Sequence, residues 1–60
     1  MCLSNVYKGE VKAENLLARN VADIRVQNGR IILTDLMGIR QEFDANIRKV
    51  DLMENYIIID

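Results

Sequence analysis

The fold of this chain is decided by residues 23–33, which read DIRVQNGRIIL. Asn28-Gly29 is the strongest short signal for a β-hairpin, because a two-residue type I′ turn needs a positive φ at both central positions. Closing the chain at this turn pairs Gln27 with Arg30, Val26 with Ile31, and Ile24 with Leu33. The register puts the apolar partners on one face and the polar residues on the other, as a half-buried strand requires. Ile32 breaks this pattern, because it falls on the polar face.

Two further turns extend the hairpin into a series of strands. Leu36-Met37-Gly38 predicts a three-residue loop with Gly38 in the left-handed conformation, which brings Ile39 and Phe43 to the inner face. Glu54-Asn55 predicts a third hairpin, although glutamate tolerates a positive φ poorly. Its expected pairs are Met53 with Tyr56, Leu52 with Ile57, and Val50 with Ile59.

Residues 9–19 do not distinguish a helix from a strand by their periodicity. The neighbouring hairpins favour a strand, with a single helical turn as the alternative. We therefore predict an all-β fold in one domain, residues 1–60: a small antiparallel barrel of about six or seven short strands, because closure would remove free sheet edges. The predicted core consists of Val6, Ile24, Val26, Ile31, Leu33, Phe43, Val50, Leu52, Ile57 and Ile59.

Length and charge limit the classes of function. A chain of 60 residues without histidine has little room for a cleft and no imidazole base, so we expect no enzyme. The net charge of −1 does not supply the basic field that nucleic-acid binding normally needs. No apolar run is long enough to span a membrane and no secretion signal is evident, so we expect a cytoplasmic protein without membrane contact.

The apolar residues exceed what a small barrel can bury. Met53, Tyr56, Ile58 and Ile32 all fall on the face opposite the predicted core. Such a surplus marks an interface, and symmetric dimers are the commonest soluble oligomers. We therefore predict a homodimer that uses Met53, Tyr56 and Ile58.

Cys2 is the only cysteine of the chain. It could be a small buried hydrophobe, a reactive thiol, half of an intermolecular pair or a metal ligand. The Met1 amine, the Cys2 amide nitrogen and the Cys2 thiolate can close adjacent chelate rings around Ni(II) or Cu(II). In a twofold dimer with Cys2 near the axis, two thiolates would form one site.

Other charged groups give weaker signals. Acidic residues near the second and third turns could form carboxylate pairs, but they alternate with basic residues, as a solvated face does; they are Asp35, Glu42, Asp44, Asp51 and Glu54. A basic strip could make the chain an RNA-binding module, against its charge balance; the strip consists of Arg19, Arg25, Arg30, Arg40, Arg48 and Lys49. A structural interaction domain with an inert Cys2 is the remaining alternative.

Several stretches together resemble the CooT family. They are the start Met1-Cys2-Leu3-Ser4, residues 20–24 (NVADI), residues 32–38 (ILTDLMG), and residues 49–52 (KVDL) followed by an isoleucine-rich end. The resemblance implies a small cytoplasmic β-protein that forms homodimers. It also implies a nickel-binding accessory protein for carbon monoxide dehydrogenase, with the cysteine after the first methionine as nickel ligand at the dimer interface.

Of the family's functional residues, only Cys2 carries over to this sequence. The hypothesis is that two Cys2 thiolates, aided by backbone nitrogens of Met1, Cys2 and Leu3, bind one Ni(II) per dimer in planar geometry. The client would be carbon monoxide dehydrogenase or another nickel enzyme.

Overall fold

Six strands form one sheet in residues 3–60, the part of the chain that this computed structural model describes. They are β1 (Ser4–Lys8), β2 (Leu16–Gln27), β3 (Arg30–Asp35), β4 (Arg40–Phe43), β5 (Ile47–Asp51) and β6 (Tyr56–Ile59). A 3-10 helix, η1 (Ala13–Asn15), precedes β2. The predicted all-β class is confirmed. No helix among the described residues is long or apolar enough to cross a membrane.

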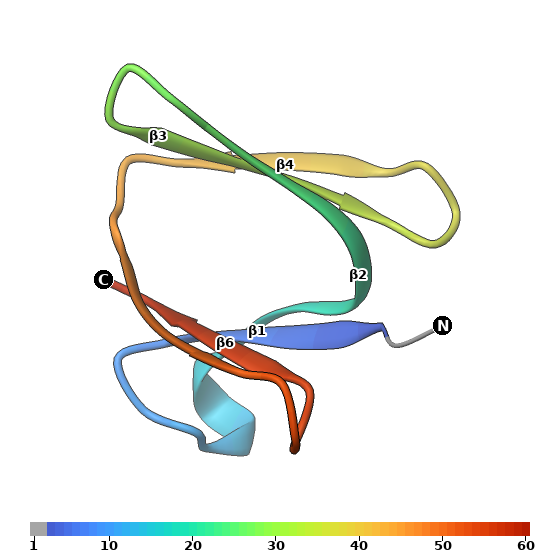
Figure 1. Ribbon diagram of the computed structural model, residues 1–60, viewed down its shortest axis with the longest axis vertical. Coiled ribbons are helices and arrows are strands. Elements are labelled where there is room, and N and C mark those ends of the chain that lie inside the picture. The colour runs from blue at the N-terminus through green and yellow to red at the C-terminus, as the bar shows by residue number, and fades with distance from the viewer. Residues whose placement is uncertain (1–2) are drawn as a thin grey trace.

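The sheet is folded into two layers and is not closed. Its strand order is β4-β3-β2-β1-β6-β5, and the long β2 bends from one layer into the other (Figure 1). The predicted small barrel-like fold of about six or seven strands is confirmed in its class and number of strands, but the expected closure and fully antiparallel pairing are not found in the described residues. The two edge strands, β4 and β5, share no ladder in the described chain, and β1 pairs with β6 in parallel. β6 is added to the edge of β1 that β2 leaves open, so its direction follows from the path of the chain and not from a local turn.

The first two turns form as the sequence predicts. Asn28 and Gly29 adopt φ values of 51° and 76°, and all three expected pairs of the first hairpin are present. Gly38 has a φ of 84°, and its amide donates to the Asp35 carbonyl oxygen at 3.0 Å, which closes the three-residue loop. Phe43 packs against the core as expected, whereas Ile39 lies just beyond the loop and is exposed.

The predicted register of the third hairpin is wrong by two residues. β5 and β6 pair Val50 with Ile57 and Asp51 with Tyr56, so the loop contains four residues, 52–55. Only Asn55 takes a positive φ, of 57°. A two-residue loop would have required a positive φ at Glu54 as well, which a side chain of that size disfavours.

Residues 9–19 contain both of the expected structures. The helical alternative is correct for η1, and the strand prediction is correct from Leu16 onward. The Leu16 amide donates to the Ala13 carbonyl oxygen, which ends the helical turn where the extended backbone begins. Gly9 precedes this segment with a φ of 78°, a conformation that glycine adopts without steric cost.

The core lies between the two layers. Its buried members come from four strands, β1, β2, β3 and β6, and are Val6, Ala18, Val21, Ile31, Leu33, Ile57 and Ile59. Leu17, Ile24, Phe43 and Ala45 pack against them and are partly buried. Val26, Val50 and Leu52 were predicted to be core and are exposed, because the unclosed sheet leaves β5 and the end of β2 without a covering layer.

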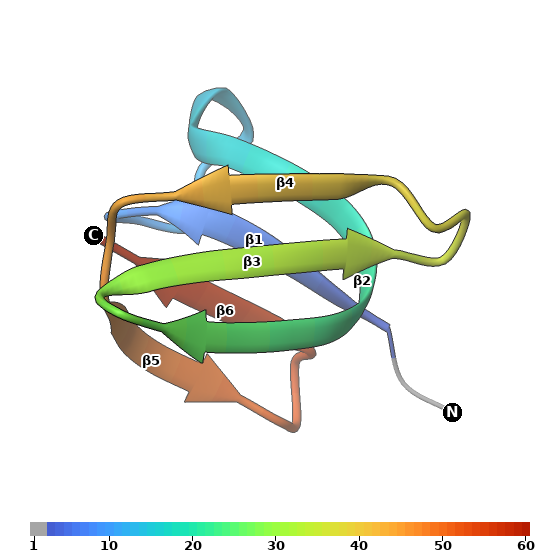
Figure 2. The ribbon, with the colours of Figure 1, turned by 90° about the horizontal axis from the view of Figure 1, so that it is seen from above.

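Ile32 also differs from the prediction. It lies on the outer face of the sheet as its parity requires, yet its exposed fraction is only 9%. Its strand, β3, lies in the middle of its layer with β2 and β4 on either side (Figure 2). Ile32 is therefore largely covered by its neighbours and offers little of its surface to a partner protein.

Candidate functional site

The predicted ligand, Cys2, lies outside the described residues together with Met1, but the chain that follows them is held firmly in the sheet. Ser4 pairs with Val21 in β2, and the Asn5 amide donates to the Asn55 carbonyl oxygen at 3.1 Å. The Asn5 side-chain oxygen accepts a hydrogen bond from the Asn20 amide at 3.3 Å. The beginning of β1 is thus attached on both sides, to β2 and to the loop before β6.

Two loops with the same three residues present apolar side chains to solvent. Asp35-Leu36-Met37 follows β3 and Asp51-Leu52-Met53 follows β5; we call them the Leu-Met turns. The exposed fractions in the first turn are 61% for leucine and 85% for methionine, and in the second 80% and 89%. The repeat is visible in the sequence and is a signal for this surface that the sequence analysis missed.

An aspartate closes each Leu-Met turn. One oxygen of the Asp35 carboxylate accepts hydrogen bonds from the amides of Met37 and Ile39, both at 2.9 Å. One oxygen of Asp51 accepts from the amides of Met53 at 3.0 Å and Glu54 at 2.8 Å. Asp35, Asp51 and Glu54, which were considered as members of carboxylate pairs, therefore belong to turns, with the two aspartates satisfying backbone donors.

Replacing Asp35 with alanine should lower the free energy of unfolding by about 1 kcal/mol, the usual effect of losing a side-chain cap. Asp35→Asn keeps the accepting oxygen and should remain close to wild type. Urea titrations followed by circular dichroism measure both variants. Equal losses in the two would contradict a role based on hydrogen bonding.

The ionisation of Asp51 makes the stability of its turn depend on pH. The hydrogen bond from the Glu54 amide is the main cause that lowers the pKa of the Asp51 carboxyl below its usual 3.8, with the Met53 amide and Lys49 acting in the same direction. A lowered pKa means that the ionised form stabilises the fold. That contribution is complete above about pH 4 and is lost as the pH falls through the folded-state pKa.

The expected result is that the melting temperature of the wild type falls more steeply below pH 4 than that of Asp51→Asn. Differential scanning calorimetry of both proteins across this range measures the difference. Parallel curves would show that the Asp51 charge contributes nothing to folding.

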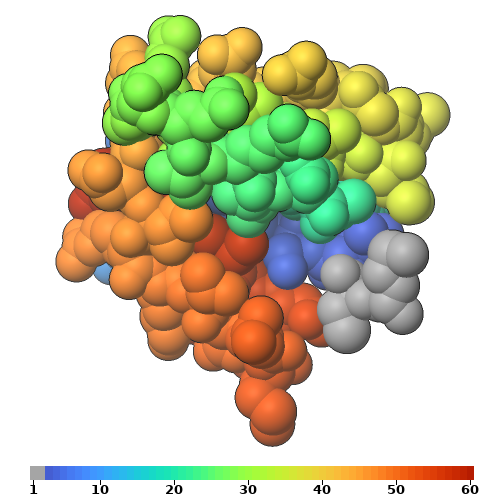
Figure 3. Space-filling model, turned by 45° about the horizontal axis from the view of Figure 1, so that its top comes forward, coloured from blue at the N-terminus to red at the C-terminus, as the bar shows by residue number. Residues whose placement is uncertain are grey.

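The two Leu-Met turns lie at the end of the molecule where β1 begins. The Leu36 amide donates to the Asn20 carbonyl oxygen at 2.9 Å, so the first turn is linked through Asn20 to Asn5. The second turn is linked to Asn5 through Asn55. Figure 3 shows the yellow β3–β4 turn beside the blue start of β1, and the orange β5–β6 turn protruding below it.

The predicted dimer residues differ in their exposure. Met53 is fully presented to solvent, whereas Tyr56 and Ile58 are half-buried on the outer face of β6. The Tyr56 ring packs edge-on against Tyr7, with centroids 6.4 Å apart. Lys49 Nζ donates to the Tyr56 hydroxyl at 2.9 Å, and this hydrogen bond raises the pKa of Lys49. Tyr56 is therefore held in place before any partner binds.

The basic strip is largely neutralised by acidic neighbours. Arg25 pairs with Asp23 at 3.4 Å, and Arg48 pairs with Asp60 at 2.8 Å. Arg30 binds both Glu42 and Asp44, at 3.5 and 3.1 Å, which accounts for the remaining two predicted acidic residues. With Lys49 3.9 Å from Asp51, four of the six members have acidic neighbours among the described residues. This pairing reduces the positive charge that the strip can offer to a long phosphate backbone, so it disfavours the RNA-binding alternative.

The described residues do not form a metal site by themselves. No three acidic side chains among residues 3–60 are grouped closely enough to hold a metal ion, and this part of the chain contains neither cysteine nor histidine. Cys2 is therefore the only thiol that the chain can offer to a soft metal ion.

Known proteins resemble this chain in sequence or in fold. MJ1551, an uncharacterized protein of Methanocaldococcus jannaschii, is 34% identical over 61 residues, which cover 100% of this chain and 98% of that protein. A crystal structure assigned to CooT from Carboxydothermus hydrogenoformans superimposes with a TM-score of 0.84 at 19% identity, covering 97% of this chain and 94% of the other. The latter similarity establishes the fold. The family model for CooT, the CO dehydrogenase accessory protein, matches residues 1–60, and the chain therefore belongs to the CooT family.

Proposed function

We propose that this protein binds Ni(II) as cargo through Cys2 at the interface of a homodimer, for delivery to carbon monoxide dehydrogenase or a related nickel enzyme in the cytoplasm. CooT is a family of accessory proteins and not of catalysts, so the chain is not an enzyme. Nickel is the substance handled here and not a resident cofactor. Thiolate sulfur and deprotonated backbone nitrogen suit Ni(II) in a planar arrangement.

The observation that carries the proposal is the surface around the beginning of β1. Ser4 and Asn5 follow Cys2 after a single intervening residue, Leu3, and are linked by hydrogen bonds toward both Leu-Met turns. Four large side chains, Leu36, Met37, Leu52 and Met53, are exposed in these turns by 61% or more. Large apolar side chains exposed at one end of a molecule are typical of protein interfaces.

A second copy of the chain is the partner that also supplies the missing ligand. One chain offers a single thiolate, and a twofold axis near the start of β1 would bring two Cys2 side chains together. Nitrogens of Met1, Cys2 and Leu3 would complete the coordination. Met53, Tyr56 and Ile58 would form the adjoining contact, with Tyr56 already fixed by Tyr7 and Lys49.

Titration of Ni(II) into the reduced protein tests the metal site. We expect a thiolate-to-nickel absorption band that saturates at about one metal ion per two chains, because two thiolates share one ion. Cys2→Ser, which removes only the sulfur, should lack the band. A band of equal strength in that variant, or no band in the wild type, would refute the proposed ligand.

The dimer contact requires its own variant. Met53→Glu should raise the dimer dissociation constant by about tenfold or more, because it places a charge in an apolar contact. Val11→Glu is the matched control: Val11 is also exposed, but lies in the segment after β1, at the opposite end of that strand. Analytical ultracentrifugation measures both variants. Equal effects of the two substitutions would place the interface elsewhere.

A further inference from the structure

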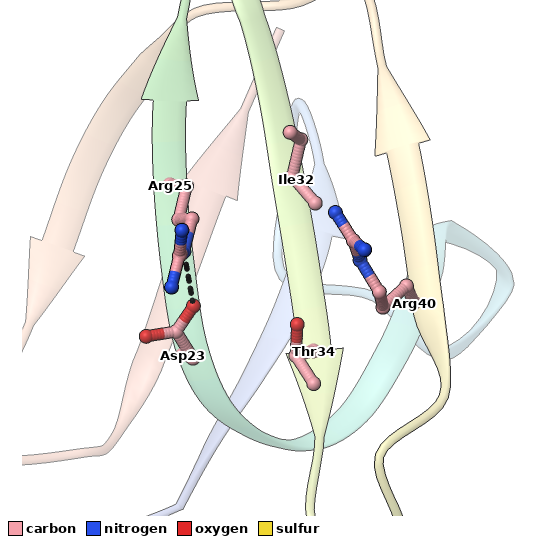
Figure 4. A pocket seen from close by; sticks show the side chains of 5 residues that line it. All are labelled: Asp23, Arg25, Ile32, Thr34 and Arg40. Atoms are coloured by element: carbon pink, nitrogen blue, oxygen red, sulfur yellow. Dashed lines mark hydrogen bonds and ion pairs between the residues drawn. The ribbon is translucent and has the colours of Figure 1, made fainter.

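A hollow on the outer face of the sheet has no part in the proposed nickel site. It has a volume of about 340 Å³ and is lined by Asp23, Arg25, Ile32, Thr34 and Arg40. These residues come from β2, β3 and β4, and their side chains stand on the face opposite the core (Figure 4).

The strand register explains why the five side chains meet. Asp23, Thr34 and Arg40 are direct cross-strand neighbours and form one row over three strands. Arg25 and Ile32 are paired in the next row. Adjacent strands lie about 4.8 Å apart and residues rise about 3.3 Å along a strand, so Arg25 on β2 and Arg40 on β4, one row apart with β3 between them, start about 12 Å apart. Two long side chains at this separation can hold one small group above the middle strand.

The two arginines differ in the ion pairs that they already form. Arg25 Nε lies 3.4 Å from an Asp23 oxygen, a long contact between exposed groups, and a guanidinium has further N–H donors available. Arg40 has no carboxylate within ion-pairing distance in the described part of the chain. Its nearest candidates by position, Glu42 and Asp44 on its own side of the layer, both bind Arg30. The Arg40 guanidinium thus has no ion-pair partner among the described residues, and the Arg25 guanidinium uses only part of its N–H donors.

The floor of the hollow is apolar. Ile32 lies between the two arginines and is only 9% exposed, although it stands on the outer face (Figure 4). Thr34 adds one hydroxyl group beside it. A surface that combines an apolar floor with a few convergent polar groups is characteristic of sites for small ligands.

We infer that this hollow binds a small organic anion, holding its carboxylate or phosphate group between Arg25 and Arg40 and its carbon skeleton against Ile32. Guanidinium groups match both oxyanions with paired hydrogen bonds. Asp23 at the wall repels a strongly charged polyanion, which favours a ligand with one anionic group over nucleic acid. The volume is at the lower end of the range for small-molecule sites, which suits a metabolite-sized ligand.

The test is a titration of the full chain, labelled with ¹⁵N, followed by amide chemical shifts. Inorganic phosphate and butyrate are the two probes, with sodium chloride at matched ionic strength as the reference. We expect saturable shifts at the amides of Ile32, Thr34 and Arg40, with a millimolar dissociation constant. Saturation by phosphate alone assigns a phosphate ligand, by butyrate alone a carboxylate, and by both an oxyanion site without preference. Shifts that do not saturate with either probe, or that chloride reproduces, overturn the proposal.

Three variants localise the site. Arg40→Gln should weaken binding by about fivefold, since it removes a charged donor from an exposed site. Arg40→Lys keeps the charge and should have an intermediate effect because it loses the paired donors. Arg19→Gln removes the same charge from β2 outside the hollow and should leave the dissociation constant unchanged. If Arg19→Gln weakens binding as much as Arg40→Gln, the effect is one of net charge and the proposed site is wrong. The same spectra show whether each variant is folded.

Discussion

Leu33→Ala is expected to remove most of the stability of this protein. Leu33 is 1% exposed and lies in the middle of β3, paired with Ile24 on one side and Gln41 on the other. Truncating a buried leucine costs about 2–5 kcal/mol, because it loses contacts and leaves a cavity. A domain of this length has on the order of 3–9 kcal/mol of total stability, at about 0.05–0.15 kcal/mol per residue. The variant should therefore unfold at much lower urea concentration than the wild type, or be unfolded without denaturant.

Val26→Ala is the matched control for this substitution. Val26 also belongs to the first hairpin and faces the same side of the sheet as Leu33, but it is 61% exposed. Its truncation should change the free energy of unfolding by about 0.5 kcal/mol or less, as is usual for surface positions. Both variants are measured by urea denaturation at one protein concentration, because dimerisation would make stability depend on concentration. Similar losses in the two would contradict the observed difference in burial.

Nickel binding is expected to weaken steeply as the pH falls from about 8 to about 6, because each coordinating thiol must lose a proton. A free cysteine thiol titrates near pH 8.5. Below that value, each released proton changes the apparent affinity by about tenfold per pH unit, so two thiolates give about a hundredfold, and each backbone nitrogen that loses a proton adds a further factor of about ten. The affinity falls and does not rise as the pH is lowered, because protons compete with the metal ion for the thiolate sulfur. Competition titrations with a chelator of known pH dependence measure the slope.

The slope of the apparent nickel affinity against pH also gives the number of groups that lose a proton when the metal ion binds. A change of about tenfold per pH unit would mean that only one group loses a proton when the metal binds. An affinity that does not change with pH would exclude thiolate coordination altogether. Cys2→Ser provides the control, since any binding that remains in it comes from other groups and should be subtracted.

The local turns of this protein were predictable from its sequence. Asn28-Gly29 determines the register of the first hairpin, and Gly38 determines the length of the second loop, because few residues accept a positive φ. Both predictions are confirmed. The third hairpin was predicted with the wrong register, since its loop is closed by two hydrogen bonds that the Asp51 carboxylate accepts from the Met53 and Glu54 amides and not by the backbone preference of a glycine.

The candidate surfaces were predictable only in part. Cys2 stands out by its chemistry and its position in the sequence, and Met53 was correctly expected on the surface. The hollow between Arg25 and Arg40 could not be found from one hairpin, because it needs the registers of β2, β3 and β4 together. Ile32 shows the same limit: its parity placed it on the outer face, but its burial depends on side chains from neighbouring strands.

The sequence by itself determined the all-β class, the first two turns and the family, because turn chemistry and alternating polarity act over a few neighbouring residues. Only the tertiary structure decided that the sheet stays open, that β1 and β6 run parallel, and that Val26, Val50 and Leu52 remain outside the core. These features depend on contacts between segments far apart in the chain, such as Val6 of β1 beside Ile57 of β6. The free energy of such contacts comes from burying both partners at once, so no local pattern contains it.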